Sequence, residues 1–241
     1  MIDKYYNGVI EQVYNHVGTT EKNIVMASYN NDFSIKKLET VKRYRKQMDS
    51  VFFASREFGY RELTGAYDPF LDTICDMFRE YGTGDFDAFM DTCGVYELHK
   101  EILRSYYENG ICTRNENVLL NEVAYEQRRM TEGIASMLKV LAKEHPVVIV
   151  INRFQMASRS TLELVRELIV HPDAGIGLVL GVNDSIGRKE SIVDVWDEIV
   201  ESIKDQSLLY HIGSSDNRRT GLIKEYPLGE GYADNVDVDE D

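Results

Sequence analysis

Hydrophobic positions along the chain follow two spacings, one typical of helices and one typical of buried strands. Between residues 3 and 17, apolar side chains recur every three or four positions, which predicts an amphipathic helix. Short apolar runs bounded by polar residues predict strands, at 23–28, 51–55, 146–151, 176–182, 208–212 and 221–226. The run at 146–151 is apolar throughout, as expected for a parallel strand that is covered on both faces.

Helical spacing separates most of these predicted strands. It predicts further helices, at 34–48, from Asp68–Pro69 onward, through most of 85–144, at 160–170 and at 190–204. Pro69 suits the first turn of its helix, where a backbone N–H is not needed. The alternation predicts an α/β fold, a three-layer αβα arrangement with a parallel sheet of about five strands. A helical insertion would lie between the second and third strands.

Composition excludes several classes of protein. The 241 residues are 43% hydrophobic and 28% charged, as in ordinary folded domains, and the net charge is −14. Such an acidic chain is poorly suited to duplex DNA or an anionic membrane. No apolar run is long enough to span a bilayer, and the three cysteines (Cys75, Cys93 and Cys112) form no CxxC pair. We therefore expect a soluble, cytoplasmic protein with no membrane contact and no nucleic acid bound through this domain.

Charge is unevenly distributed along the chain. Residues 229–241 are rich in acids and are expected to be a disordered tail that follows a core of residues 1–228. Six basic residues lie on the predicted helix at 36–46: Lys36, Lys37, Lys42, Arg43, Arg45 and Lys46. A solvated helix face explains them, and so does a surface for an acidic partner or nucleic acid.

Three segments resemble a known family. Residues 146–169, PVVIVINRFQMASRSTLELVRELI, are similar to the Walker B region of the STAND and AAA-like P-loop ATPases. Eight residues keep step with that pattern: Phe154, Gln155, Ala157, Ser160, Thr161, Leu162, Glu163 and Leu164. Residues 66–72 resemble the family's Pro-Tyr-x-Pro-Phe helix start, and 226–228 resemble the turn into its helical lid. The resemblance spans residues 23–228 and implies a P-loop NTPase-like fold.

The phosphate-binding loop of that family is degenerate here. A Walker A motif needs glycines for close backbone approach, a lysine for the phosphate charge and a hydroxyl for magnesium. In the motif's frame, Ser28 and Phe33 replace glycines, Ser34 replaces the lysine and Ile35 replaces the hydroxyl residue. The loop therefore lacks each group that would position and neutralise a triphosphate.

The magnesium-binding end of the family's site is changed as well. Asn152 and Arg153 stand where the resemblance implies the two Walker B acids, and Asn183 follows the next strand, where a polar or basic sensor is expected. Asn can accept a hydrogen bond from a magnesium-bound water but supplies no charge to hold the ion. ATP hydrolysis is not expected. Asn152 and Arg153 could keep a role in ligand binding or could cap the strand and bond a neighbouring loop.

The resemblance implies a function by analogy. The leading hypothesis is a non-hydrolysing P-loop NTPase-like regulatory module of a bacterial signalling protein, with no cofactor. Its partners would be other proteins or downstream domains of the same polypeptide, such as a diguanylate cyclase or a DNA-binding domain. The alternative is a sensory domain that still binds ATP or ADP, with an open crevice that Phe33 or Tyr29 would otherwise fill. An enzyme of unrelated chemistry is least favoured, because no nucleophile–base–acid set is recognisable.

Overall fold

The computed structural model describes residues 2–19, 23–29, 51–59, 65–110, 123–183, 193–205 and 209–212. Several predicted features lie outside these residues: the helix at 34–48 with its basic positions, the strand at 221–226, Cys112 and the acidic end. Phe33, Ser34 and Ile35 of the predicted nucleotide site also lie outside them.

The described strands and helices follow the predicted order. The strands are β1 (Ile24–Tyr29), β2 (Phe52–Glu57), β3 (Val147–Asn152), β4 (Ile176–Asn183) and β5 (Leu209–Ile212). The helices are α1 (Ile2–His16), α3 (Phe70–Tyr81), α4 (Phe86–Thr92), α5 (Glu97–Asn109), α6 (Val123–Glu144), α7 (Arg159–Val170) and α8 (Val193–Asp205). A short 3-10 turn, η1 (Phe154–Met156), follows β3.

The strands form one parallel sheet. Four of them lie in the order β2-β3-β4-β1, and β5 adds in parallel to the free side of β1. Ala54, Ile149, Leu178 and Ile24 are opposite one another in register across the four strands. The predicted α/β fold with a parallel sheet is confirmed, and helices α3 to α6 stand between β2 and β3 as expected.

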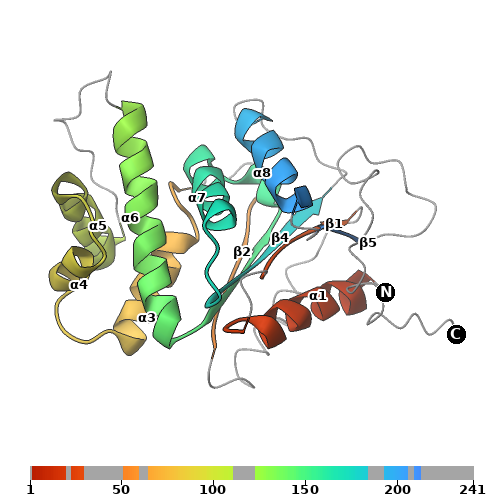
Figure 1. Cartoon of the computed structure of the whole chain (residues 1–241), viewed down its shortest axis with the longest axis horizontal. Helices are drawn as coiled ribbons and strands as arrows, with labels where there is room; N and C mark the ends of the chain where they lie inside the picture. Colours follow the sequence, from red (N-terminus) through yellow and green to blue (C-terminus); the bar gives the residue numbers. More distant parts are fainter. Residues whose placement is uncertain are drawn as a thin grey trace, which may run out of the picture.

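Helices cover both faces of the sheet (Figure 1). Helix α1 packs on one face, where Val13 and Val17 join Val148 and Val150 of β3 in an apolar cluster. Gly177 of β4 allows this approach, because a Cβ there would lie 2.6 Å from Val13 Cγ1. The larger core lies on the other face, beneath α3, α6, α7 and α8. Every residue of β3 is buried, as its unbroken apolar run predicts.

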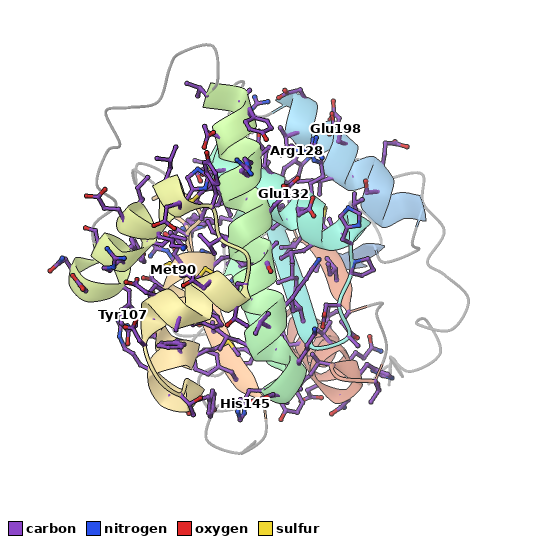
Figure 2. All side chains as sticks on the ribbon, turned by 60° about the vertical axis from the view of Figure 1, so that its left-hand side comes forward. Met90, Tyr107, Arg128, Glu132, His145 and Glu198 are labelled. Carbon is purple, nitrogen blue, oxygen red and sulfur yellow. The ribbon has the colours of Figure 1, made fainter. Side chains whose placement is uncertain are left out.

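The insertion packs around the long helix α6. Met90 of α4 is fully buried, and Tyr107 of α5 lies near it (Figure 2). Where α3, α4 and α5 meet, Tyr107 stacks on Phe86, and Phe78 contacts both rings edge-on. Helical spacing predicts an apolar side of α6 made of Val123, Met130, Ile134, Met137, Leu138 and Leu141. All of these residues are buried except Val123, which is 44% exposed. This first turn of α6 is therefore surface rather than core.

The turn at 66–69 is anchored between two helices. The N–H of Tyr67 donates to Ser160 Oγ at 3.3 Å, and the hydroxyl of Tyr67 lies 3.2 Å from Thr131 Oγ1 on α6. Thr161 of α7 donates its hydroxyl to the Asp68 carbonyl at 3.0 Å. The helix then begins at Phe70, so Pro69 stands at its N-cap rather than in its first turn.

Candidate functional site at the carboxyl edge of the sheet

The direction of the strands selects one edge of the sheet as a candidate site. Because all five strands are parallel, their carboxyl ends meet at the same edge. The next strand after β1 is β2, which lies at one end of the sheet, past β4 and β3. The next strand after β4 is β5, which lies at the opposite end of the sheet, past β1. The strand order therefore reverses between β1 and β4. Open α/β sheets bind ligands outside the carboxyl ends of strands at such a reversal.

The structure brings four of the sequence-predicted residues to this edge. Ser28 and Asn183 lie near the ends of the adjacent strands β1 and β4, with Tyr29 opposite Asn183 in register. Asn152 ends β3, the next strand across, and Arg153 follows it directly. These residues therefore lie at the ends of three consecutive strands of the sheet.

Arg153 is bonded into the edge of the sheet. Its backbone has a φ of 54°, in the left-handed region that residues other than glycine rarely adopt. Its guanidinium forms an ion pair with Glu57 at the end of β2, with 3.0 Å between Nη2 and Oε1. It also donates from Nη1 to the Phe58 carbonyl at 3.2 Å. Arg153 therefore joins the carboxyl ends of β3 and β2.

This ion pair is largely removed from water. The Arg153 side chain is 13% exposed and the Glu57 side chain is 9% exposed. Two charges in such a place are stable only together, since an unpaired buried charge carries a large desolvation cost. Sequence reasoning missed Glu57, because its predicted strand stopped at residue 55. A charged residue that continues an apolar strand was the available signal.

Buried amide groups occupy the neighbouring strand ends. Asn152 and Asn183 are each 2% exposed, and Gln155 of η1 is fully buried. Gln155 donates from Nε2 to the Asn183 carbonyl at 2.8 Å, and its Oε1 accepts the Asn183 N–H at 3.4 Å. The Gln155 side chain thus replaces a strand partner at the end of β4. Because buried polar groups need hydrogen-bond partners, this contact has a structural reason.

A second ion pair lies beside the first. Arg56 Nε of β2 donates to Asp68 Oδ2 at 3.0 Å, and the Asp68 side chain is 12% exposed. Arg56 also lies over the Phe58 ring, 5.5 Å from its centroid. These contacts fix the turn at 66–69 to the end of β2. Sequence reasoning predicted a helix start at Asp68–Pro69 but neither of these contacts.

The groups at this edge do not fit a magnesium–triphosphate complex. The carboxylate at the end of β2, Glu57, is paired with Arg153, and Asn152 supplies an uncharged oxygen. In the described part of the chain, no three His, Cys, Asp or Glu side chains come together in a group that could hold a metal ion. Among the residues that the structure describes, this edge is polar but has no unpaired carboxylate placed for the ion.

Neither the helices nor the comparisons with known proteins assign this chain to a family. Within the described residues, every helix is too short or too polar to cross a bilayer. Scans against models of protein families and against curated proteins found no match. The relation to the STAND and AAA-like ATPases therefore remains a prediction from the residues quoted above.

Proposed function

We propose that this chain is a non-hydrolysing, P-loop NTPase-like regulatory module that acts through contacts with proteins or with further domains of its own polypeptide. The main support is the pair formed by Arg153 and Glu57 beside Asn152. The family resemblance implies acids at 152 and 153, where they would hold the magnesium ion. In their place stand a neutral amide and a cation that is already paired. These two positions therefore lack the negative charge that triphosphate hydrolysis requires.

The arrangement of the sheet supports the finer description of the fold. The strands β1, β3 and β4 precede the positions compared with Walker A, Walker B and the sensor, and they are consecutive in the sheet. The reversal of strand order between β1 and β4 lies at the same edge. A P-loop NTPase-like domain in three αβα layers accounts for both features. The changed residues, rather than a changed scaffold, then explain the loss of hydrolysis.

Thermal unfolding of the full chain tests this proposal. The chain would be heated with and without magnesium, in the presence of ATP, ADP, GTP or a cyclic dinucleotide. A ligand that binds only the folded state at 100 times its dissociation constant stabilises it by about 2.7 kcal/mol, which is several degrees for a domain of this size. We expect no shift with any of the four.

A magnesium-dependent shift with ATP or ADP would overturn the proposal in favour of the nucleotide-sensing alternative. The variant Asn152→Ala then separates a shift caused by this edge of the sheet from binding elsewhere. A shift that persists unchanged in that variant would place the nucleotide outside the predicted site.

A further inference from the structure

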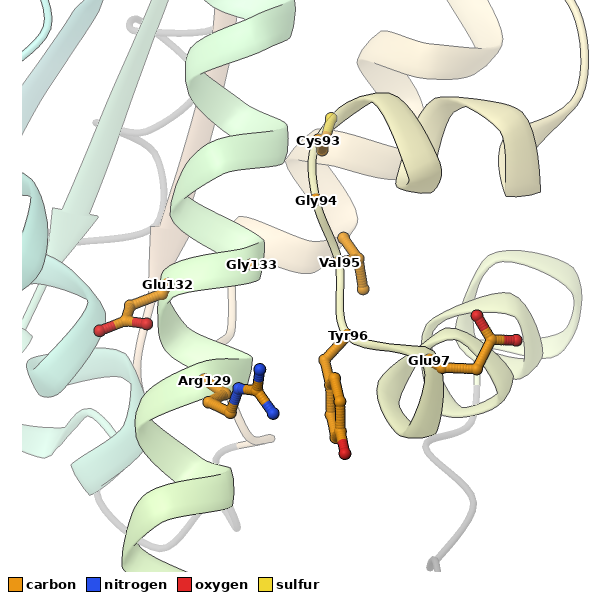
Figure 3. A pocket seen from close by; sticks show the side chains of 8 residues that line it. All are labelled: Cys93, Gly94, Val95, Tyr96, Glu97, Arg129, Glu132 and Gly133. Atoms are coloured by element: carbon orange, nitrogen blue, oxygen red, sulfur yellow. The ribbon is translucent and has the colours of Figure 1, made fainter.

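An open groove lies on the insertion and shares no residue with the sheet edge described above. It runs between α6 and the segment 93–97 that joins α4 to α5, with a volume of about 440 Å³ (Figure 3). Arg129 enters it from α6 and Tyr96 enters from the opposite wall. Gly133 of α6 faces Val95, so the two walls approach closely at its floor.

Two aromatic rings hold Arg129 in place. The centre of its guanidinium lies 3.8 Å from the Tyr96 ring centroid and 5.2 Å from the Tyr125 ring centroid. A guanidinium over an aromatic face is attracted to the ring while its N–H groups remain directed to the sides. Tyr125 is 59% exposed, so one of the two rings stands at the surface.

The acids near Arg129 are engaged by other cations. Glu97 accepts a hydrogen bond from Lys100 at 2.5 Å. On the side of α6 that faces away from Tyr96, Glu132 accepts from Arg128 at 2.8 Å, one helical turn away (Figures 2 and 3).

The third acid near the groove is engaged as well. Glu126 lies 2.9 Å from Nε2 of the buried His99, a contact that joins the first turns of α5 and α6. Among the residues that the structure describes, Arg129 forms no ion pair. Its guanidinium is thus pre-positioned by tyrosines and not neutralised by a described carboxylate.

We propose that Arg129 anchors a carboxylate side chain of a partner protein in this groove. Arg and Tyr are the residues that dominate many interface energies, and a guanidinium binds a carboxylate through two parallel hydrogen bonds. The first turns of α5 and α6 also expose Leu98 (41%), Val123 (44%) and Tyr125 (59%). These apolar side chains suit a partner segment in which the acid stands beside apolar residues. The inference rests on the proposed interaction function and names the chemistry of the partner.

Charge favours a protein partner over a nucleic acid. Binding along a phosphate backbone requires several cations, whereas the groove supplies one cation beside Glu97 and Glu132. The net charge of the whole chain is −14, which opposes a polyanion further. One carboxylate against one guanidinium requires no other positive charge.

Peptide selection on the full chain tests the proposal before any natural partner is identified. Random twelve-residue peptides would be selected on the immobilised protein, and the best binder would be titrated beside a version with each Glu or Asp changed to its amide. We expect selected peptides to carry an acid next to apolar residues. The amide version should bind at least tenfold more weakly to the unmodified protein.

Two variants of the protein test the groove's part in peptide binding, and a third serves as the control. Arg129→Gln should weaken the acidic peptide at least tenfold, and Tyr125→Ala should weaken it less. Lys143→Gln removes the same charge from the last turn of α6, away from the groove, and should leave the affinity unchanged. Unfolding temperatures of the variants verify that each is folded.

Several results would overturn the inference. They are a selection that yields no binder, binders without carboxylates, an amide peptide of equal affinity, or full affinity in folded Arg129→Gln. Displacement of the acidic peptide by oligothymidylate would point to a nucleic acid instead. A nucleotide could also raise the unfolding temperature while peptide binding still depends on Arg129. That result would contradict only the proposal that the chain binds no nucleotide, and the inference about the groove would stand.

Discussion

Two arginines show how differently this chain uses the same side chain. Arg153 follows the central strand, at the position that its resemblance to the ATPases makes most suggestive. Its guanidinium is almost buried and is bonded to Glu57 and to a backbone carbonyl. Arg129 is a half-buried residue of the insertion that no sequence motif indicated, and its guanidinium lies over two tyrosine rings.

The difference shows that position in a fold does not by itself leave a charge available to a ligand. Arg153 stands at a typical ligand-binding edge, yet its charge stabilises the join between β2 and β3. Arg129 has no described acidic partner although three acids lie near it. Whether a cation can bind a ligand depends on its burial and on whether a carboxylate already neutralises it, and not on the strand that it follows.

Removal of Arg153 should have the largest effect. Arg153→Met leaves Glu57 buried without its cation, and breaking such a pair costs about 3–5 kcal/mol of unfolding free energy. Arg129→Gln, which removes a half-buried cation from two tyrosine rings, should lower it by only about 1 kcal/mol. Urea denaturation of both variants measures the contrast.

The double variant Glu57→Gln with Arg153→Met tests the cause. It removes both charges, so it should recover a large part of the stability lost in Arg153→Met. Equal stability losses for the single variants at 153 and 129 would contradict the contrast between the two arginines.

A methyl group at Gly133 should stabilise the insertion. Gly133 lies inside α6, and an added Cβ would meet Val95 Cγ2 at 3.7 Å, an ordinary contact. Because alanine is a better helix former, Gly133→Ala should raise the unfolding free energy by about 0.5–1 kcal/mol. Urea denaturation measures the gain. A loss of stability would mean that the walls of the groove are packed more tightly than the structure indicates.

His99 should make the groove region sensitive to pH. Burial lowers the pKa of His99 below its ordinary 6.5, against the opposing influence of Glu126. The unfolded chain therefore takes up this proton at a higher pH than the folded chain. The contribution of His99 to stability should be complete above pH 6.5 and decrease as the pH falls below it.

Unfolding free energies from pH 7.5 to pH 5 measure this effect against the variant His99→Gln. The amide keeps a hydrogen-bond donor near Glu126 but does not titrate. Relative to His99→Gln, the unmodified protein should lose stability as the pH falls. A relative gain at low pH would reverse the predicted sign.

The thiol of Cys93 should resist alkylation although its residue lines the groove. Cys93 is 7% exposed, and burial raises its pKa to about 12. Since the thiolate is the reactive form, iodoacetamide at pH 8 should label Cys93 only after unfolding. Mass spectrometry of the labelled peptides measures this. Rapid labelling of the folded chain would show that the groove opens more deeply than described.

Periodicity predicted the framework of the fold because buried strands and amphipathic helices must match their environment. The apolar run at 147–151 is buried throughout, and the helical spacing at 160–170 corresponds to α7. Those patterns depend on contacts that every α/β fold makes, so they are visible even where the partners of each residue are unknown.

The roles of single polar residues were less predictable. The ion pair of Arg153 with Glu57 and the contact of Arg129 with Tyr96 join segments that are distant in sequence. Tyr96 and Arg129 are separated by 33 positions, and nothing in the local pattern of either segment indicates the other. Such contacts follow only from the way the strands and helices pack in three dimensions.

Phosphate release from ATP tests the central claim most directly. The full chain would be incubated with ATP and magnesium, and inorganic phosphate would be measured over time beside a protein-free control. Because Asn152 and the paired Arg153 supply no free carboxylate for the ion, we predict release no faster than in the control. Magnesium-dependent release that disappears in Asn152→Ala would contradict the account.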